Sequence, residues 1–119
     1  MTRVLVVDDR NDTLGFVRVA LERAGYAVDV AVNGQQALDL QRRIAADVLI
    51  TDIFMPEMDG IEVIDAIKAE YPRTRVIAMS GGVAGMQDYL PVSKDIGADA
   101  TLSKPFTTEE LLQVLQTVL

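Results

Sequence analysis

Five residues with reactive side chains stand where apolar segments of the sequence end. Each segment is short and rich in β-branched residues, which is typical of a buried strand. Together the five residues offer three carboxylates, one hydroxyl and one ammonium group. They are Asp8, Asp9, Asp52, Ser80 and Lys104.

Three carboxylates brought together repel one another, and a shared divalent cation relieves that repulsion. A site made only of oxygen ligands, with few of them from the protein, suits Mg²⁺. A nearby lysine can neutralise a further anion, and a carboxylate is a competent nucleophile for phosphoryl transfer. The residue types therefore indicate a magnesium site with a lysine placed to neutralise a further anion.

Each residue also has a simpler explanation. A single Asp at a strand end is usually a turn or cap residue, and Asp8-Asp9 could cap a following helix. Ser80 precedes two glycines, as an ordinary loop residue would, and a lysine before a proline suits a solvated strand end. We favour the functional interpretation because all five fall at the ends of four different strands.

Composition excludes several other chemistries. The 119 residues contain no cysteine and no histidine, which removes disulfides, thiolate ligands, imidazole bases and most zinc sites. The net charge is −7, from 18 acids against 11 bases, which disfavours direct binding to nucleic acid or anionic lipid. No apolar run approaches the ~20 residues needed to cross a bilayer, and no signal peptide is evident, so we expect a cytoplasmic location.

Strand and helix patterns alternate along the chain. This alternation, without linker or repeat, predicts one α/β domain with a doubly wound (βα)5 fold. We expect a central five-stranded parallel sheet of order 2-1-3-4-5, in which right-handed crossovers place the ends of strands one and three side by side. The expected strands are residues 3–7, 27–31, 47–51, 75–79 and about 100–102, and the expected helices are 12–24, 34–44, 60–71, 91–97 and 108–118.

Cap signals set the expected helix boundaries. Asn11 or Asp12 is expected to cap the first helix, with Gly25 as its stop, and Asn33 opens the second. The third and last helices carry capping-box signatures. These are Asp59 with Glu62 and Thr107 with Glu110.

Four sequence motifs resemble a known family. They are the pair DD at 8–9, TDIFMPEMDG at 51–60, MSGG at 79–82 and GADATLSKPF at 97–106. In this order and spacing they are similar to the receiver domain of two-component response regulators, which has a flavodoxin-like fold. The similarity runs over essentially the whole chain.

The resemblance implies a role for each acid. Asp52 would accept a phosphoryl group from a histidine kinase or a histidine phosphotransfer protein. Asp9, Asp52 and the backbone carbonyl of Phe54 would bind Mg²⁺ directly, and Asp8 would bind it through water. The donor histidine would belong to the partner protein, so this chain would be a signalling phosphoacceptor rather than a kinase.

The resemblance also implies how the signal is passed on. Lys104 would pair with the installed phosphoryl group, and Ser80 would donate a hydrogen bond to it. The region from the loop after Ser80 to the last helix would then change conformation and control a downstream protein target or an output domain. The Lys104-Pro105 bond is expected to be cis.

The chain departs from the family pattern at the position three residues before the lysine. Thr101 stands there instead of the usual aromatic switch residue, and Tyr89 is a candidate substitute. Phe54 is bulky and could shield the phosphoryl group from water. Leu112 and Leu119 either widen the core face of the last helix or form a contact patch. Such a patch would serve a target protein or a homodimer through the fourth helix, fifth strand and last helix.

Two other functions stay open. A magnesium-dependent phosphohydrolase also uses an Asp nucleophile on an α/β fold, but typically carries a DxD pair and a larger cap. A phosphorylation-independent docking module is the other alternative, although it would not need three acids. We expect residues 1–119 to form a single receiver domain without an output domain, whether as a stand-alone protein or as a fragment.

Overall fold

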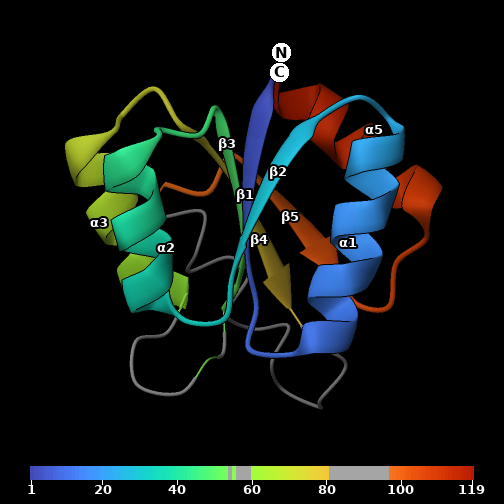
Figure 1. The fold of residues 1–119 in the computed structure, drawn as a ribbon, viewed down its shortest axis with the longest axis horizontal. Helices are drawn as coiled ribbons and strands as arrows, with labels where there is room; N and C mark the ends of the chain where they lie inside the picture. Colours follow the sequence, from blue (N-terminus) through green and yellow to red (C-terminus); the bar gives the residue numbers. More distant parts are fainter. Residues whose placement is uncertain (54, 56–59, 81–96) are drawn as a thin grey trace.

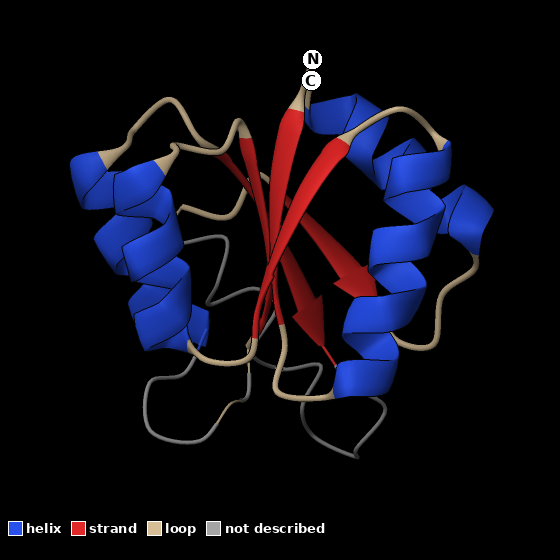
Figure 2. Cartoon of the chain, in the orientation of Figure 1, coloured by secondary structure: helices blue, strands red, loops and turns tan. Residues whose placement is uncertain are grey.

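The computed structural model describes residues 1–53, 55, 60–80 and 97–119, which form a parallel sheet between two helical layers (Figures 1 and 2). The sheet has five strands in the order β2-β1-β3-β4-β5, and every pairing is parallel. This is the topology expected from the sequence. The strands are β1 Arg3–Val7, β2 Ala27–Ala31, β3 Val48–Asp52, β4 Arg75–Ser80 and β5 Ala100–Ser103.

Helices cover both faces of the sheet. One face carries α1 (Asn11–Arg23) and α5 (Thr108–Val118), and the other carries α2 (Gly34–Arg43) and α3 (Gly60–Glu70). Both chain termini lie at the amino ends of the strands, and the carboxyl ends point to the opposite edge (Figure 1). The doubly wound α/β fold is therefore confirmed, while the expected fourth helix lies almost entirely outside the described residues.

The strands are buried on both faces, so successive side chains enter two different cores. On β1, Val4 and Val6 face the core under α1 and α5, whereas Leu5 and Val7 face the core under α2 and α3. The first core is completed by Leu14, Val17, Leu21, Ile50, Ile77, Met79, Leu111 and Leu115. The second is completed by Leu49, Ile53, Val63, Ile64, Ile67 and Val76.

Several of the expected caps are confirmed. The Asn33 side chain accepts a hydrogen bond of 2.8 Å from the backbone N–H of Gln36. Thr107 and Glu110 form the reciprocal capping box, with both bonds 3.1 Å long. These bonds fix where α2 and α5 begin.

The expected cap of α1 is wrong. The N-cap residue is Arg10, which makes no side-chain cap bond, and the helix already includes Asn11. Asp12 is in the first turn, where its carboxylate accepts a hydrogen bond of 2.8 Å from the Thr13 N–H. A carboxylate in the first turn complements the helix dipole without being a cap. The other expected acidic cap, Asp59, lies outside the described residues.

Three strands, β3, β4 and β5, end one residue later than expected. Asp52 is the last residue of β3 and Ser80 the last of β4, because each is still paired across the sheet. Asp52 is in register with Met79, and Ser80 with Ser103. Both side chains therefore project from paired extended backbone rather than from a loop.

The α5 helix has a wide core face. Leu111 and Leu115 are fully buried, and Leu112 packs partly buried against the same core, which favours a wide core face and leaves the contact patch a prediction. Leu119 remains 57% exposed. Within the described part of the chain, no helix is long and apolar enough to span a membrane.

Candidate functional site

The carboxyl edge of the sheet brings together the acids that the sequence singled out. Asp8 directly follows β1, and Asp52 ends the neighbouring strand β3, whose Thr51 is in register with Val7. Adjacent parallel strands end at one edge, so these side chains meet there. Carboxylate oxygens of Asp8, Asp9 and Asp52 all lie within 4.8 Å of one another.

The three acids differ in exposure. Asp8 is fully buried, Asp52 is 6% exposed and Asp9 is exposed to solvent. A buried carboxylate needs hydrogen bonds or a cation to remain charged. Asp9 is therefore the solvent-exposed member of the cluster, while Asp8 and Asp52 are its buried members.

Both oxygens of Asp8 are bound. Its Oδ1 accepts a hydrogen bond of 2.9 Å from the backbone N–H of Arg10, and its Oδ2 is 2.6 Å from the Lys104 Nζ. The backbone N–H of Asp8 donates to the Ala31 carbonyl on β2, at 3.1 Å. These bonds hold Asp8 rigidly at the base of the site.

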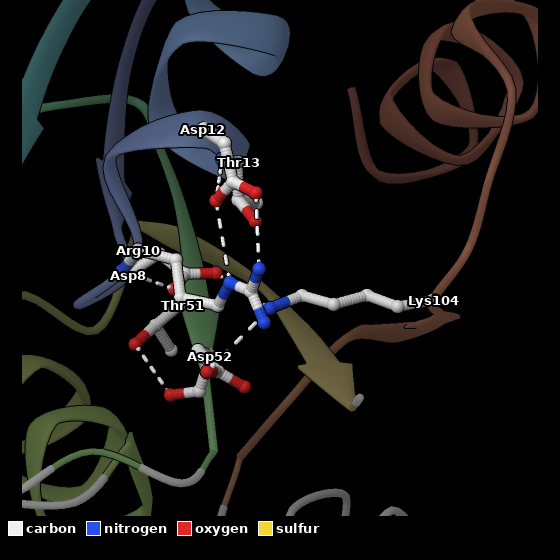
Figure 3. Close-up of polar contacts among 7 residues, drawn as sticks. All are labelled: Asp8, Arg10, Asp12, Thr13, Thr51, Asp52 and Lys104. Atoms are coloured by element: carbon white, nitrogen blue, oxygen red, sulfur yellow. Dashed lines mark hydrogen bonds and ion pairs between the residues drawn. The ribbon is translucent and has the colours of Figure 1, made fainter. Parts of the chain in front are cut away.

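The Lys104 side chain extends to the cluster from the end of β5, the edge strand of the sheet (Figure 3). Besides bonding Asp8, its Nζ lies 3.5 Å from Asp52 Oδ2. Its backbone N–H donates to the Ser80 carbonyl at 2.8 Å, which fixes the residue just beyond β5. The Lys104-Pro105 peptide bond is cis, as expected. The lysine thus lies beside the Asp52 carboxylate.

Ser80 is 1% exposed and ends β4, next to the strand that carries Asp52. The Ile53 N–H donates to the Met79 carbonyl at 3.0 Å, so β3 and β4 stay paired up to the residue before Ser80. The five residues predicted from sequence therefore all lie at one sheet edge.

Gly60 is a site residue that sequence reasoning treated only as the end of a turn. A side chain there would collide with the Asp52 carbonyl oxygen and would come within 2.7 Å of the Ile53 Cα. The Gly60 N–H donates to the Ile53 carbonyl at 2.7 Å. Only glycine allows α3 to begin this close to the end of β3. The Asp-Gly pair in the sequence was a signal of a tight turn, but not of this contact.

Arg10 is the second residue that sequence reasoning missed. Its Nε and Nη2 atoms bond the two carboxylate oxygens of Asp12, at 3.2 and 3.0 Å (Figure 3). The hydrogen bond and charge of Asp12 raise the pKa of Arg10, and the charges of Asp8 and Asp9 add to the rise. The same hydrogen bond lowers the pKa of Asp12, with help from the Thr13 N–H. Arg10 is therefore within the electrostatic field of the acid cluster.

An aromatic contact ties the segment after Lys104 to α1. The rings of Phe16 and Phe106 stack with centroids 5.8 Å apart and an interplanar angle of 26°. Phe106 follows the cis proline directly, so the stack helps to fix the course of the chain between β5 and α5.

Some expectations fall outside the described residues. These are the metal-binding carbonyl and the shielding role of Phe54, the substitute switch Tyr89 and the loop glycines Gly81, Gly82 and Gly85. Thr101 is described, as a partly buried residue of β5 in register with Ala78. A threonine there has no ring to rotate, so the aromatic switch position is filled by a different kind of residue.

The acid cluster fits a hard divalent cation. Its donors are all carboxylate oxygens, they converge within 4.8 Å, and two of the three groups are buried. Within the described part of the chain, the Lys104 ammonium is the side-chain cation that contacts Asp8 and Asp52. The three carboxylates therefore carry three negative charges against the one positive charge of this lysine. Oxygen ligands with surplus negative charge are the environment that Mg²⁺ prefers.

Comparison with known proteins places the chain in a family. Residues 4–116 match the family described as response regulator receiver domain. The chain is 32% identical over 117 residues to the transcriptional regulatory protein TrcR of Mycobacterium tuberculosis, covering 98% of this chain and 45% of that protein. It is 33% identical over 109 residues to sporulation initiation phosphotransferase F of Bacillus subtilis, covering 92% of this chain and 86% of that one.

Solved structures show the same fold. The chemotaxis protein CheY4 of Vibrio cholerae superposes with a TM-score of 0.91 and 35% identity, covering 100% of this chain and 99% of that chain. The chain spans about half the length of the transcriptional regulators it matches, at 45% of TrcR and 50% of the regulator MprA. By sequence match, fold and the arrangement of its acid cluster, the chain belongs to the receiver domain family of response regulators.

Proposed function

We propose that the chain is a phosphorylatable signalling switch whose acceptor is Asp52. The observation that carries this proposal is the convergence of three carboxylates and Lys104 at the carboxyl edge of a parallel sheet. Asp52 is proposed as the acceptor because it ends the central strand β3 and its Oδ2 lies 3.5 Å from the Lys104 Nζ, which also bonds Asp8 (Figure 3).

The proposed reaction is a phosphoryl transfer. A carboxylate oxygen of Asp52 forms a bond to phosphorus while the bond between phosphorus and the donor's imidazole nitrogen breaks. The donor is a histidine kinase or a histidine phosphotransfer protein, and its imidazole leaves with the electron pair of the broken bond. Catalysis in such a transfer is mainly positioning and charge neutralisation, which is what a fixed site can supply.

Mg²⁺ is the proposed cofactor, and it supplies charge neutralisation between the acceptor and the phosphoryl oxygens. Asp9 and Asp52 are proposed as its direct ligands, with Asp8 acting through water and the Phe54 carbonyl completing the set. The bonds from Arg10 and Lys104 to Asp8 keep that carboxylate oriented toward the cluster.

Lys104 and Ser80 are proposed to recognise the installed phosphoryl group. The Lys104 Nζ is already 3.5 Å from Asp52 Oδ2, so a small movement brings it to a phosphoryl oxygen. Ser80 ends β4, and its movement toward the phosphoryl group would pull the chain that follows. That displacement would change the surface that a downstream protein or an output domain contacts.

The location and the partners of the chain are proposed on the basis of its charge and surface. We propose a cytoplasmic location and no direct binding to nucleic acid or membrane, in keeping with the net charge of −7. A homodimer through β5, α5 and the segment between β4 and β5 is proposed as one output, and the exposed Leu119 at the end of α5 is consistent with it.

The test is covalent labelling. We expect a small acyl phosphate with Mg²⁺ to add one phosphoryl group, which intact mass spectrometry detects, and we expect Asp52→Asn to abolish the adduct. Chelation of Mg²⁺ should abolish it as well. Asp39→Asn, on the exposed face of α2, is the matched control and should label like the wild type.

Two results would favour other functions. Turnover of many equivalents of a phosphoester by the wild type would indicate a phosphohydrolase. Neither an adduct nor Mg²⁺ binding would indicate a docking module.

A further inference from the structure

Arg10 is anchored at the rim of the acid cluster. Its backbone N–H donates to Asp8 Oδ1 at 2.9 Å, and Asp8 is fully buried. The Arg10 side chain therefore starts from a fixed point next to one of the three clustered carboxylates. An arginine side chain is long and flexible, so its guanidinium can adopt different positions at the entrance of the site.

The guanidinium is paired with a weakly held partner, Asp12. Arg10 binds Asp12 through two hydrogen bonds, but the two side chains are 67% and 70% exposed. Exposed ion pairs contribute only about 0–1 kcal/mol. A more highly charged anion at the site could therefore take the guanidinium from Asp12 at little cost.

The site needs a second cation when a phosphoryl group arrives. Among the described residues, the Lys104 ammonium contacts Asp8 and Asp52 of the three clustered carboxylates, and its shorter contact is with Asp8. A phosphoryl group brings further negative charge, of which one Mg²⁺ neutralises only a part. A planar guanidinium with paired N–H donors is well suited to bind phosphoryl oxygens.

We propose that Arg10 is a phosphoryl-binding residue that Asp12 holds in reserve. In the resting state Arg10 is paired with Asp12. When the donor enters, the guanidinium leaves Asp12, binds oxygens of the phosphoryl group in transfer and remains with it on Asp52. The inference rests on the proposed function of Asp52 as the acceptor.

This arrangement predicts opposite effects for the two partners. Arg10→Ala removes the phosphoryl contact and should slow phosphorylation about tenfold, the effect of a charge-assisted bond discounted for exposure. Asp12→Asn frees the guanidinium and should accelerate phosphorylation about two- to threefold, as for the loss of an exposed pair. Arg10→Lys keeps the charge without the fork and should recover part of the lost rate.

The experiment measures the initial rate of labelling of Asp52 by phosphoramidate, read by intact mass at saturating Mg²⁺. The donor concentration is varied, so that donor affinity and maximal rate are obtained separately. The variants are Arg10→Ala, Arg10→Lys, Asp12→Asn and the Arg10→Ala/Asp12→Asn double variant. The matched control is Arg18→Ala, which removes the exposed Arg18–Glu22 pair from the same helix.

The double variant decides the mechanism. If Asp12 acts through Arg10, the double variant should label as slowly as Arg10→Ala alone. An acceleration by Asp12→Asn that persists without Arg10 would show a general charge effect and overturn the proposal. So would an unchanged rate in Arg10→Ala, or an equal loss in Arg18→Ala.

Failure of the underlying function gives a different result. If the wild type takes no phosphoryl group at Asp52, the acceptor role falls and this inference falls with it. If the wild type is labelled and Arg10→Ala is labelled equally fast, only the role of Arg10 is overturned. Thermal midpoints of the variants should match the wild type, because Arg10 and Asp12 are both exposed.

Discussion

The two ends of the sheet use buried polar groups in different ways. At the amino end, a closed set of neutral hydrogen bonds joins α2 to the segments that enter β3 and β4. Gln41 Nε2 donates to Thr74 Oγ1 at 3.1 Å, Thr74 Oγ1 donates to the Ala46 carbonyl at 2.9 Å, and the Ala46 N–H donates to Gln41 Oε1 at 2.9 Å. Each of these three hydrogen bonds joins two neutral groups.

The carboxyl end instead concentrates charge of one sign. Oxygens of three carboxylates lie within 4.8 Å of one another, two of these groups contact Lys104, and those two, Asp8 and Asp52, are buried. Uncompensated negative charge is unfavourable for folding but favourable for binding a cation and for reacting with an electrophile. The neutral hydrogen bonds at the amino end therefore stabilise the fold, whereas the charged groups at the carboxyl end are suited to chemistry.

The largest effect is expected from Gly60→Ala at the carboxyl end. The added methyl group would meet the Asp52 carbonyl, which is backbone and cannot rotate away, so we expect a loss of about 3 kcal/mol in the free energy of unfolding. Denaturant titration measures it. Gly15→Ala is the control, because nothing lies within 4 Å of the added group, and should stabilise α1 by about 0.5–1 kcal/mol. Equal stability of the two variants would contradict the packing described around Gly60.

A loss of about 2–3 kcal/mol is expected from Gln41→Ala at the amino end. The change leaves the buried Ala46 N–H without its acceptor and removes the donor to the Thr74 hydroxyl, which keeps its own bond to the Ala46 carbonyl. Chemical unfolding measures the loss, and phosphorylation of the folded protein should be unaffected. Gln35→Ala, on the exposed side of the same helix, should change stability by less than about 0.5 kcal/mol. A slower phosphorylation rate in Gln41→Ala would show that the two ends are not independent.

Asp9→Asn should increase the free energy of unfolding instead of decreasing it. Without Mg²⁺ it removes one of three repelling charges, and we expect a gain of about 0.5–1 kcal/mol in the free energy of unfolding. With Mg²⁺ at a hundred times its dissociation constant, the wild type should gain about 2.7 kcal/mol. The variant should gain much less at the same concentration.

Thermal unfolding with and without EDTA measures both effects of Asp9→Asn. Asp65→Asn, on the exposed face of α3, should respond to Mg²⁺ as the wild type does. A loss of stability in metal-free Asp9→Asn would refute the claim that the cluster is repulsive.

The smallest effect concerns the titration of Asp12. The Arg10 hydrogen bond lowers the pKa of Asp12, so Arg10→Ala should return that pKa toward its ordinary value. A lowered pKa in the folded state stabilises the fold above the unfolded-state pKa, and this contribution is lost as pH falls through the folded-state value. Carbon-13 NMR of the carboxyl group follows the titration. An unchanged pKa in Arg10→Ala would contradict the pairing.

Local signals in the sequence predicted most of the fold. Asn33 and Thr107 cap their helices as expected, because a cap depends on residues within one turn. The alternation of apolar runs predicted the parallel sheet, and the positions of Asp8 and Asp52 at strand ends predicted their meeting.

What the sequence did not predict depends on tertiary contacts. The need for glycine at position 60 arises from the path of β3 beneath it. Asp12 was expected to cap α1 but lies in its first turn. There its carboxylate accepts hydrogen bonds from the Arg10 guanidinium and from the Thr13 N–H. Lys104 was expected to pair with a phosphoryl group on Asp52, yet its shortest contact is with Asp8. This pairing depends on side-chain geometry, which no sequence pattern encodes.

The most direct test of the central claim is to locate the phosphoryl group. The wild type is labelled with an acyl phosphate and Mg²⁺ and then treated with borohydride, which reduces an aspartyl phosphate to homoserine. Peptide mass spectrometry should find homoserine in place of Asp52 and unmodified aspartate at positions 8 and 9. Homoserine at position 8 or 9, or at no position, would contradict the assignment of Asp52 as the acceptor.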